Sequence, residues 1–92
     1  MATGTLMNGL KTVKIPQSEF GWTDATKAFV KNNYTPTFST VVGYLVRFTD
    51  GTVVGGARYK AEEHALYVTG WVPQTAAAIT SAFHFECYEI GY

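Results

Sequence analysis

The sequence has few of the residues on which disulfides, metal sites and nucleic-acid surfaces depend. Its 92 residues include one cysteine, Cys87, two histidines and three prolines. A single cysteine excludes an internal disulfide, so stability has to come from packing or from a partner chain. Seven basic and seven acidic residues cancel. That balance excludes the strongly basic composition typical of proteins that bind nucleic acids or anionic membranes.

Long apolar runs are missing as well. No segment approaches the roughly 18 apolar residues of a membrane-spanning helix. The first residues lack the basic and apolar regions of a signal peptide. The length suits one domain, so we expect a single domain over residues 1–92. We expect it to be made in the cytoplasm without a signal peptide, and to stay soluble or to enter a larger assembly.

Aromatic residues, by contrast, are abundant: six Tyr, six Phe and two Trp. A domain of this size has a limited interior for so many large rings. Either thin, two-sided strands expose a few rings without consequence, or some rings form a contact surface. Tyr and Trp are the residues enriched at protein interfaces.

Alternating apolar and polar residues, rich in β-branched and aromatic types, predict strands at residues 10–15, 40–48, 64–72 and 82–92. Both faces of residues 64–72 are mostly apolar, so we expect this strand to be covered on both sides. The predicted class is α+β and mainly β. We expect an antiparallel sheet of four to five strands with one short helix, with a small sandwich or barrel as the alternative.

The predicted helix covers residues 24–31. Thr23 and Asp24 suit a helix start, and Ala25, Ala28 and Phe29 follow the i, i+3, i+4 spacing of one helical face.

The pair at residues 50–51, Asp-Gly, lies between two apolar runs and predicts a two-residue β-hairpin. That turn would place Val46 opposite Gly55 and Leu45 opposite Gly56. Glycine weakens a strand, and inside one it often marks the close approach of another group. We expect internal packing against these glycines, with a second chain as the alternative.

No arrangement of residues predicts catalysis. His84 and Glu86 project from one face of the last strand, but a zinc site needs three or four ligands. Cys87 points to the opposite face from His84, so a buried structural thiol is expected rather than a nucleophile. Cofactor-binding and nucleophile motifs do not occur. We therefore expect no enzyme activity, no cofactor and no metal.

The composition resembles that of small assembly subunits, such as the decoration, fibre and tail modules of bacteriophage particles, in general character and not in any motif. The first hypothesis is a non-enzymatic structural protein that associates with itself or docks on a larger protein lattice. Alternatives are a monomeric module for a glycan or single-stranded nucleic acid, the latter disfavoured by the missing basic groove, and an inhibitor that adds an edge strand to its target. The predicted contact residues are Trp22, Tyr44, Tyr59, Trp71, Tyr88, Ile90 and Tyr92.

Overall fold

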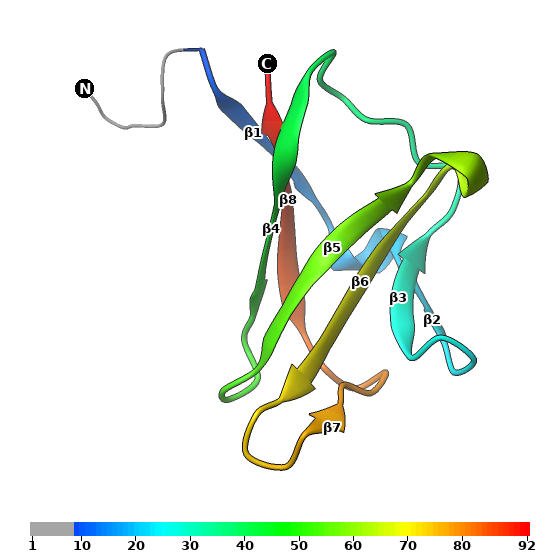
Figure 1. Cartoon of the computed structure of the whole chain (residues 1–92), viewed down its shortest axis with the longest axis vertical. Coiled ribbons are helices and arrows are strands. Elements are labelled where there is room, and N and C mark those ends of the chain that lie inside the picture. Colours follow the sequence, from blue (N-terminus) through cyan, green and yellow to red (C-terminus); the bar gives the residue numbers. More distant parts are fainter. Residues whose placement is uncertain (1–8) are drawn as a thin grey trace.

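The computed structural model describes residues 9–92 and forms two antiparallel sheets that pack on each other (Figure 1). The three-stranded sheet has the order β1 (Lys11–Ile15), β8 (Phe85–Gly91), β4 (Val41–Phe48). The five-stranded sheet has the order β2 (Gly21–Thr23), β3 (Ala28–Lys31), β6 (Ala65–Val72), β5 (Val54–Lys60), and β7 (Ala77–Ala78) also pairs with β6. Two 3-10 turns cover Gln17–Glu19 and Ala61–Glu63. The mainly β, antiparallel prediction is confirmed, in its sandwich form.

The core lies between the two sheets and is built from aromatic and branched side chains. Phe85 of β8 is at its centre, with ring centroids 5.3 Å from Phe20, 5.0 Å from Phe29 and 5.8 Å from Phe48. These rings join both sheets, and such contacts are the main source of stability in a chain without disulfides. The other buried members of this cluster are Ile15, Tyr34, Leu66, Val68, Ile79 and Cys87.

The helix predicted over residues 24–31 does not form. Residues 24–27 make a turn in which Lys27 has a left-handed φ of 51°, and Ala28–Lys31 is strand β3, paired with both β2 and β6. Ala28, Phe29 and Val30 are all buried. The apolar spacing fitted a helical face, but in the strand Phe29 faces the core between the sheets. Ala28 and Val30 are buried on the opposite face, where Ala65 and Tyr67 pack with them.

The predicted hairpin between residues 40–48 and 52–59 is also wrong. Strand β4 pairs with β8 over its whole length, and β5 pairs with β6. Gly51 has a φ of +60°, whereas Asp50 is outside the left-handed region that a type I′ turn requires. The Asp50 carboxylate instead accepts a hydrogen bond from the backbone N–H of His84. The connection therefore crosses from one sheet to the other.

Internal packing against the glycines is confirmed at one of the two positions. Gly55 of β5 lies opposite Gly70 of β6, and the Phe48 ring lies over this pair. A Cβ on Gly55 would meet the Phe48 ring at 2.7 Å, and a Cβ on Gly70 would meet it at 3.0 Å. At Gly56, on the other face of β5, a Cβ would meet no atom within 4 Å. The ring thus comes from the same chain, and only Gly55 has to be small.

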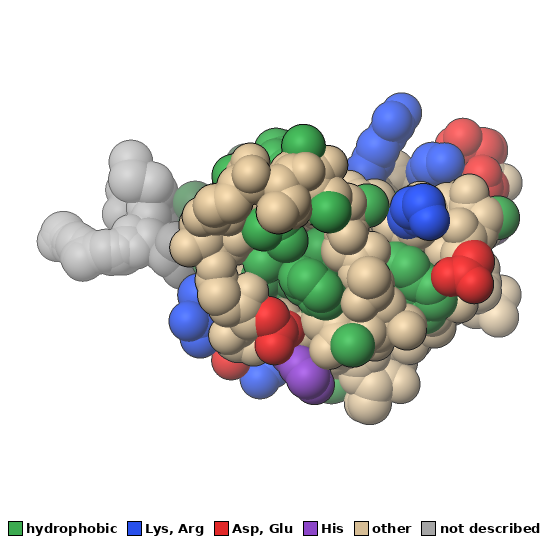
Figure 2. All heavy atoms as spheres, turned by 90° about the horizontal axis from the view of Figure 1, so that it is seen from below, with side chains coloured by type: hydrophobic (Ala, Val, Ile, Leu, Met, Phe, Trp, Pro, Cys, Tyr) green, Lys and Arg blue, Asp and Glu red, His purple; other side chains and the backbone are tan. Residues whose placement is uncertain are grey.

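Strand β6 was expected to be covered on both faces, and this is wrong for its second half. Leu66, Val68 and Gly70 are buried on the inner face, whereas Thr69 and Trp71 are exposed on the outer face, because the described part of the chain has no third layer over this sheet. The expected last strand is confirmed as β8, which is paired on both sides. Seen from the end that carries the β4–β5 connection, apolar side chains gather between the two layers (Figure 2).

Candidate interaction surfaces

The structure separates the seven predicted contact residues into different places. Trp22, Tyr44 and Tyr59 are half-buried and pack against the core. Tyr88 and Ile90 lie on the outer face of the three-stranded sheet. Trp71 lies on the outer face of the five-stranded sheet, and Tyr92 is exposed at the end of β8. They therefore do not form one surface, and the largest group that shares one outer face is the half-buried pair on β8.

The outer face of the three-stranded sheet carries an apolar group. Leu45 of β4 is the register partner of Tyr88, which in turn lies opposite Lys14 of β1. Ile90 lies two residues further along β8, opposite Gly43. Leu45 is 53% exposed. Directly opposed side chains on one sheet face are about 5 Å apart, so Leu45, Tyr88 and Ile90 are contiguous. We call these three residues the apolar outer face.

Charged residues border the apolar outer face at one end. Arg47 of β4 lies opposite Glu86 of β8, and its guanidinium donates to one carboxylate oxygen at 2.8 and 3.2 Å. At the other end Val42, in a bulge of β4, is 59% exposed and Tyr92 is 57% exposed. This sheet face thus offers exposed apolar surface beside a charge pair that is internally neutral.

Leu45 and Val42 were missing from the predicted contact set. The alternation of β4 contained the information for Leu45, because Tyr44, Val46 and Phe48 share one phase and Leu45 has the other. If the side of the strand that carries Tyr44 and Phe48 faces the core, Leu45 has to point outward, because successive side chains of a strand alternate between its two faces. Val42 could not be found this way, since the bulge after Val41 breaks the alternation.

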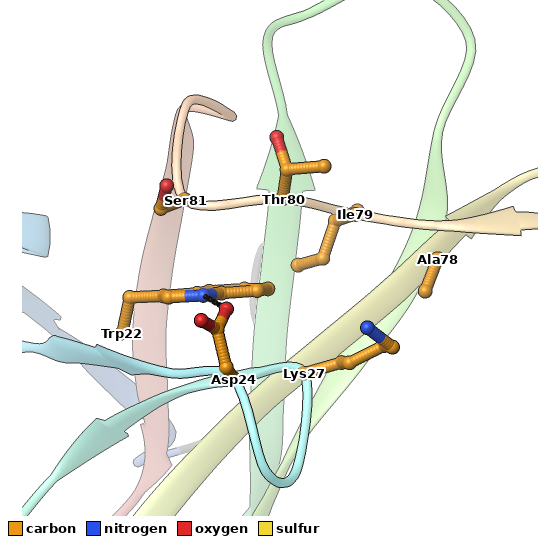
Figure 3. A pocket seen from close by; sticks show the side chains of 7 residues that line it. All are labelled: Trp22, Asp24, Lys27, Ala78, Ile79, Thr80 and Ser81. Carbon is orange, nitrogen blue, oxygen red and sulfur yellow. Dashed lines mark hydrogen bonds between the residues drawn. The ribbon is translucent and has the colours of Figure 1, made fainter.

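Trp22 lines a cleft of about 230 Å³ at the end of the five-stranded sheet (Figure 3). Its indole N–H donates to the Asp24 carboxylate at 2.6 Å, and its ring packs edge-on against Phe29 with centroids 5.0 Å apart. Across the cleft lies the segment of residues 78–81, with Ile79 buried and Ser81 exposed. Trp22 therefore combines core packing with a partly open side chain.

A buried carboxylate, Glu89, holds the connection before β4 in place. It accepts hydrogen bonds from the Tyr34 hydroxyl, from the backbone N–H of Thr37 at 3.0 Å, and from that of Phe38 at 2.9 Å. Glu89 is fully buried. Three donors converge on two oxygens, the arrangement that offsets the desolvation of an acidic group. Its role is structural, because the site is closed to solvent.

Two phenols beside Glu89 are poor proton donors to a base. Burial, and then the hydrogen bond to Glu89, raise the pKa of Tyr34 far above its ordinary value. Burial also raises the pKa of Tyr44, whose hydroxyl has no hydrogen-bond partner among residues 9–92. Both phenols stay neutral at physiological pH, so this group has no acid–base chemistry to offer.

The other chemically active side chains are engaged in structural contacts. Cys87 is buried, and burial raises the pKa of its thiol to about 11, which leaves almost no nucleophilic thiolate at neutral pH. His84 contacts Asp50 at 3.3 Å, and Glu86 is held by Arg47, so the expected H-x-E pair is divided between two partners. In the part of the chain that the structure describes, no three His, Cys, Asp or Glu side chains converge as metal ligands.

Across residues 9–92, none of the helical segments has the length and apolar character needed to span a membrane. No protein-family model, no curated protein and no solved structure matches the chain.

Proposed function

We propose that this chain is a non-enzymatic structural protein that assembles with copies of itself through the apolar outer face. The observation that carries the proposal is the exposure of Leu45 on the edge strand β4, beside the half-buried Tyr88 and Ile90 of the central strand β8. Single exposed apolar residues are ordinary, whereas a contiguous group on a regular face is typical of an interaction site.

Charge favours a second copy as the occupant. The whole chain has no net charge, and Arg47 and Glu86 neutralise each other beside the apolar outer face. Lys14 of β1, which lies opposite Tyr88, adds one positive charge to this face. Two copies therefore approach with weak repulsion at most, and an acidic partner would gain an electrostatic advantage only at Lys14.

The contact is small, which affects how the protein works. Three strands spaced about 4.8 Å apart, at about 3.3 Å per residue, give an outer face on the order of 300 Å². A stable interface buries roughly 800 Å² per partner. One such contact is weak and reversible, so a lasting assembly has to repeat it many times. A larger protein lattice supplies that repetition, and we propose a bacteriophage particle, with this chain as a decoration, fibre or tail module.

Sedimentation equilibrium from about 10 µM to 1 mM tests the proposal, a range chosen because small interfaces associate weakly. The wild-type chain should show an average mass that rises with concentration. Leu45→Lys should remain monomeric, because it places a charge at the centre of the contact. The matched control is Val54→Lys, which introduces the same charge at a residue 46% exposed on the other sheet, and it should associate as the wild type does.

A wild-type chain that is monomeric at every concentration would contradict self-association. Equal loss of association in both variants would also contradict it, because the effect would then follow from added charge and not from the face that received it.

A further inference from the structure

The outer face of the five-stranded sheet contains a second cleft, of about 240 Å³, that has no part in the proposed assembly. Ala28, from β3, lies in its floor and is fully buried. Tyr67 of β6 forms one wall. The remaining lining residues are Thr26, Arg58, Lys60 and Thr69. The cleft exists because small residues line up across the sheet here, where Gly56, Thr69 and Ala28 leave room beside larger neighbours.

The charged side chains that line this cleft are all hydrogen-bond donors. Arg58 and Lys60 are two residues apart on β5 and therefore project from the same face. Within residues 9–92, neither has a carboxylate within 4.0 Å. Thr26 and Thr69 add hydroxyls that can donate or accept. A ligand that fits these groups has to bring acceptor oxygens and negative charge.

Contacts around Tyr67 fix this wall of the cleft. Its hydroxyl donates to the Glu63 carboxylate, and that hydrogen bond raises the pKa of the phenol. The Lys60 ammonium lies 4.3 Å from the ring centroid, a cation–π contact that holds the lysine at the cleft. None of the residues that line the cleft is acidic, and the nearby Glu63 carboxylate is engaged by the Tyr67 hydroxyl.

We propose that this cleft binds an acidic sugar unit through its carboxylate, sulfate or phosphate group. Arg58 supplies a planar pair of donors that matches an oxyanion, and Lys60 adds a second positive charge. Thr26 and Thr69 face the hydroxyls of the sugar, and the Tyr67 ring contacts its apolar atoms. The volume suits a compact ligand. This inference is independent of the assembly proposal, because it concerns the opposite sheet.

A single-stranded nucleic acid fits the same face less well. Such ligands require a positive groove that follows several phosphates, together with stacking platforms. Beyond Arg58, the outer positions of β5 and β6 are Gly56, Thr69, Val54 and Trp71, none of which is cationic. The positive charge is thus local and matches one anionic group.

Titration of the ¹⁵N-labelled full chain followed by NMR tests the inference. The probes are glucuronate, glucose 6-phosphate, inorganic phosphate, glucose and an eight-nucleotide oligothymidylate, all at low salt. Both acidic sugars should shift the Arg58 Nε–H resonance and the Thr69 amide in a saturable way. Inorganic phosphate should bind more weakly, and glucose should produce no saturable shift. Comparing the carboxylate with the phosphate ester shows which oxyanion the cleft prefers.

Two charge-matched variants sharpen the test. Arg58→Gln should weaken binding of the preferred sugar acid at least fivefold, the order expected for loss of one charge-assisted hydrogen bond. Lys11→Gln, which removes one positive charge from an exposed strand end on the other sheet, should change it less than twofold. The spectrum of each variant shows that it is folded. Thr69→Ala removes a hydroxyl without changing the charge, and it should also lower the affinity for the sugar acid.

Three results would overturn the inference. The first is unchanged affinity in Arg58→Gln. The second is an equal, non-saturable response of Arg58 and Lys11, which indicates general attraction of anions. The third is tighter binding of the oligonucleotide than of either sugar acid at the same residues, which would assign the face to a polyanion.

Discussion

The two sheets share one core but distribute polar groups in opposite ways. The three-stranded sheet has a buried carboxylate, Glu89, on its inner face and the apolar outer face on its other side. The five-stranded sheet is apolar on the inside, at Leu66 and Val68, and outside it carries Arg58 and Lys60, neither of which has a carboxylate within 4.0 Å among residues 9–92.

The difference shows that side-chain polarity does not by itself indicate which side of a strand is buried. Glu89 is tolerated inside because three donors from residues 34–38, the segment before β4, satisfy its carboxylate oxygens. Leu45 is left outside because, within residues 9–92, no third layer covers the small sheet. The three-stranded sheet therefore departs from the simple rule on both faces, whereas the five-stranded sheet, apolar inside and cationic outside, follows it.

The largest expected effect tests the inner face of the small sheet. In Glu89→Gln, one acceptor oxygen is replaced by an NH₂ group that faces a donor, so the free energy of unfolding should fall by about 2–4 kcal/mol. Glu86→Gln, on the same strand but on the exposed face, should lower it by less than about 1 kcal/mol. Denaturant titration of both variants gives the comparison. Equal losses would mean that the Glu89 clamp is not what holds residues 34–38.

A second pair of variants contrasts the two faces of the large sheet. Gly55→Ala adds a Cβ that meets the Phe48 ring and the Thr69 carbonyl oxygen, and it should destabilise the fold by about 1–3 kcal/mol. Gly56→Ala, one residue along, adds a Cβ in open space and should be neutral or stabilising by up to about 1 kcal/mol. Thermal unfolding distinguishes them. A stable Gly55→Ala would show that Phe48 does not lie over this glycine pair.

The smallest expected effect concerns the junction between the sheets. Hydrogen bonds from the backbone and imidazole of His84 lower the pKa of Asp50 below its usual 3.8. A lowered pKa in the folded state stabilises the protein above pH 3.8, and this contribution is lost as the pH falls through the lowered value. In Asp50→Asn, the melting temperature should therefore decline less between pH 6 and pH 2 than in the wild type. Parallel curves for the two proteins would show that this contact contributes nothing.

Part of the candidate surface could be derived from the sequence. Tyr88 and Ile90 were expected at a contact surface from their positions on the last strand, and both lie on the apolar outer face. Tyr44 and Tyr59 belong to the same predicted set but pack against the core. Residue type alone does not distinguish a tyrosine that fills the core from one that faces solvent, because both uses favour a large ring with a polar tip.

The sequence by itself determined the long strands β4 and β8, since the β-branched and aromatic alternation from Val41 to Phe48 and from Phe85 to Gly91 acts locally. It did not determine β3, whose apolar spacing also fitted a helix. The missing disulfide and the burial of Cys87 follow equally from local composition. Only the tertiary structure decided which strands pair. The connection at Asp50 forms a corner between sheets and not a hairpin, because Phe48 has to cover Gly55 and Gly70 while β8 takes the edge of β4. Pairing is a competition among distant segments, so neighbouring residues alone do not settle it.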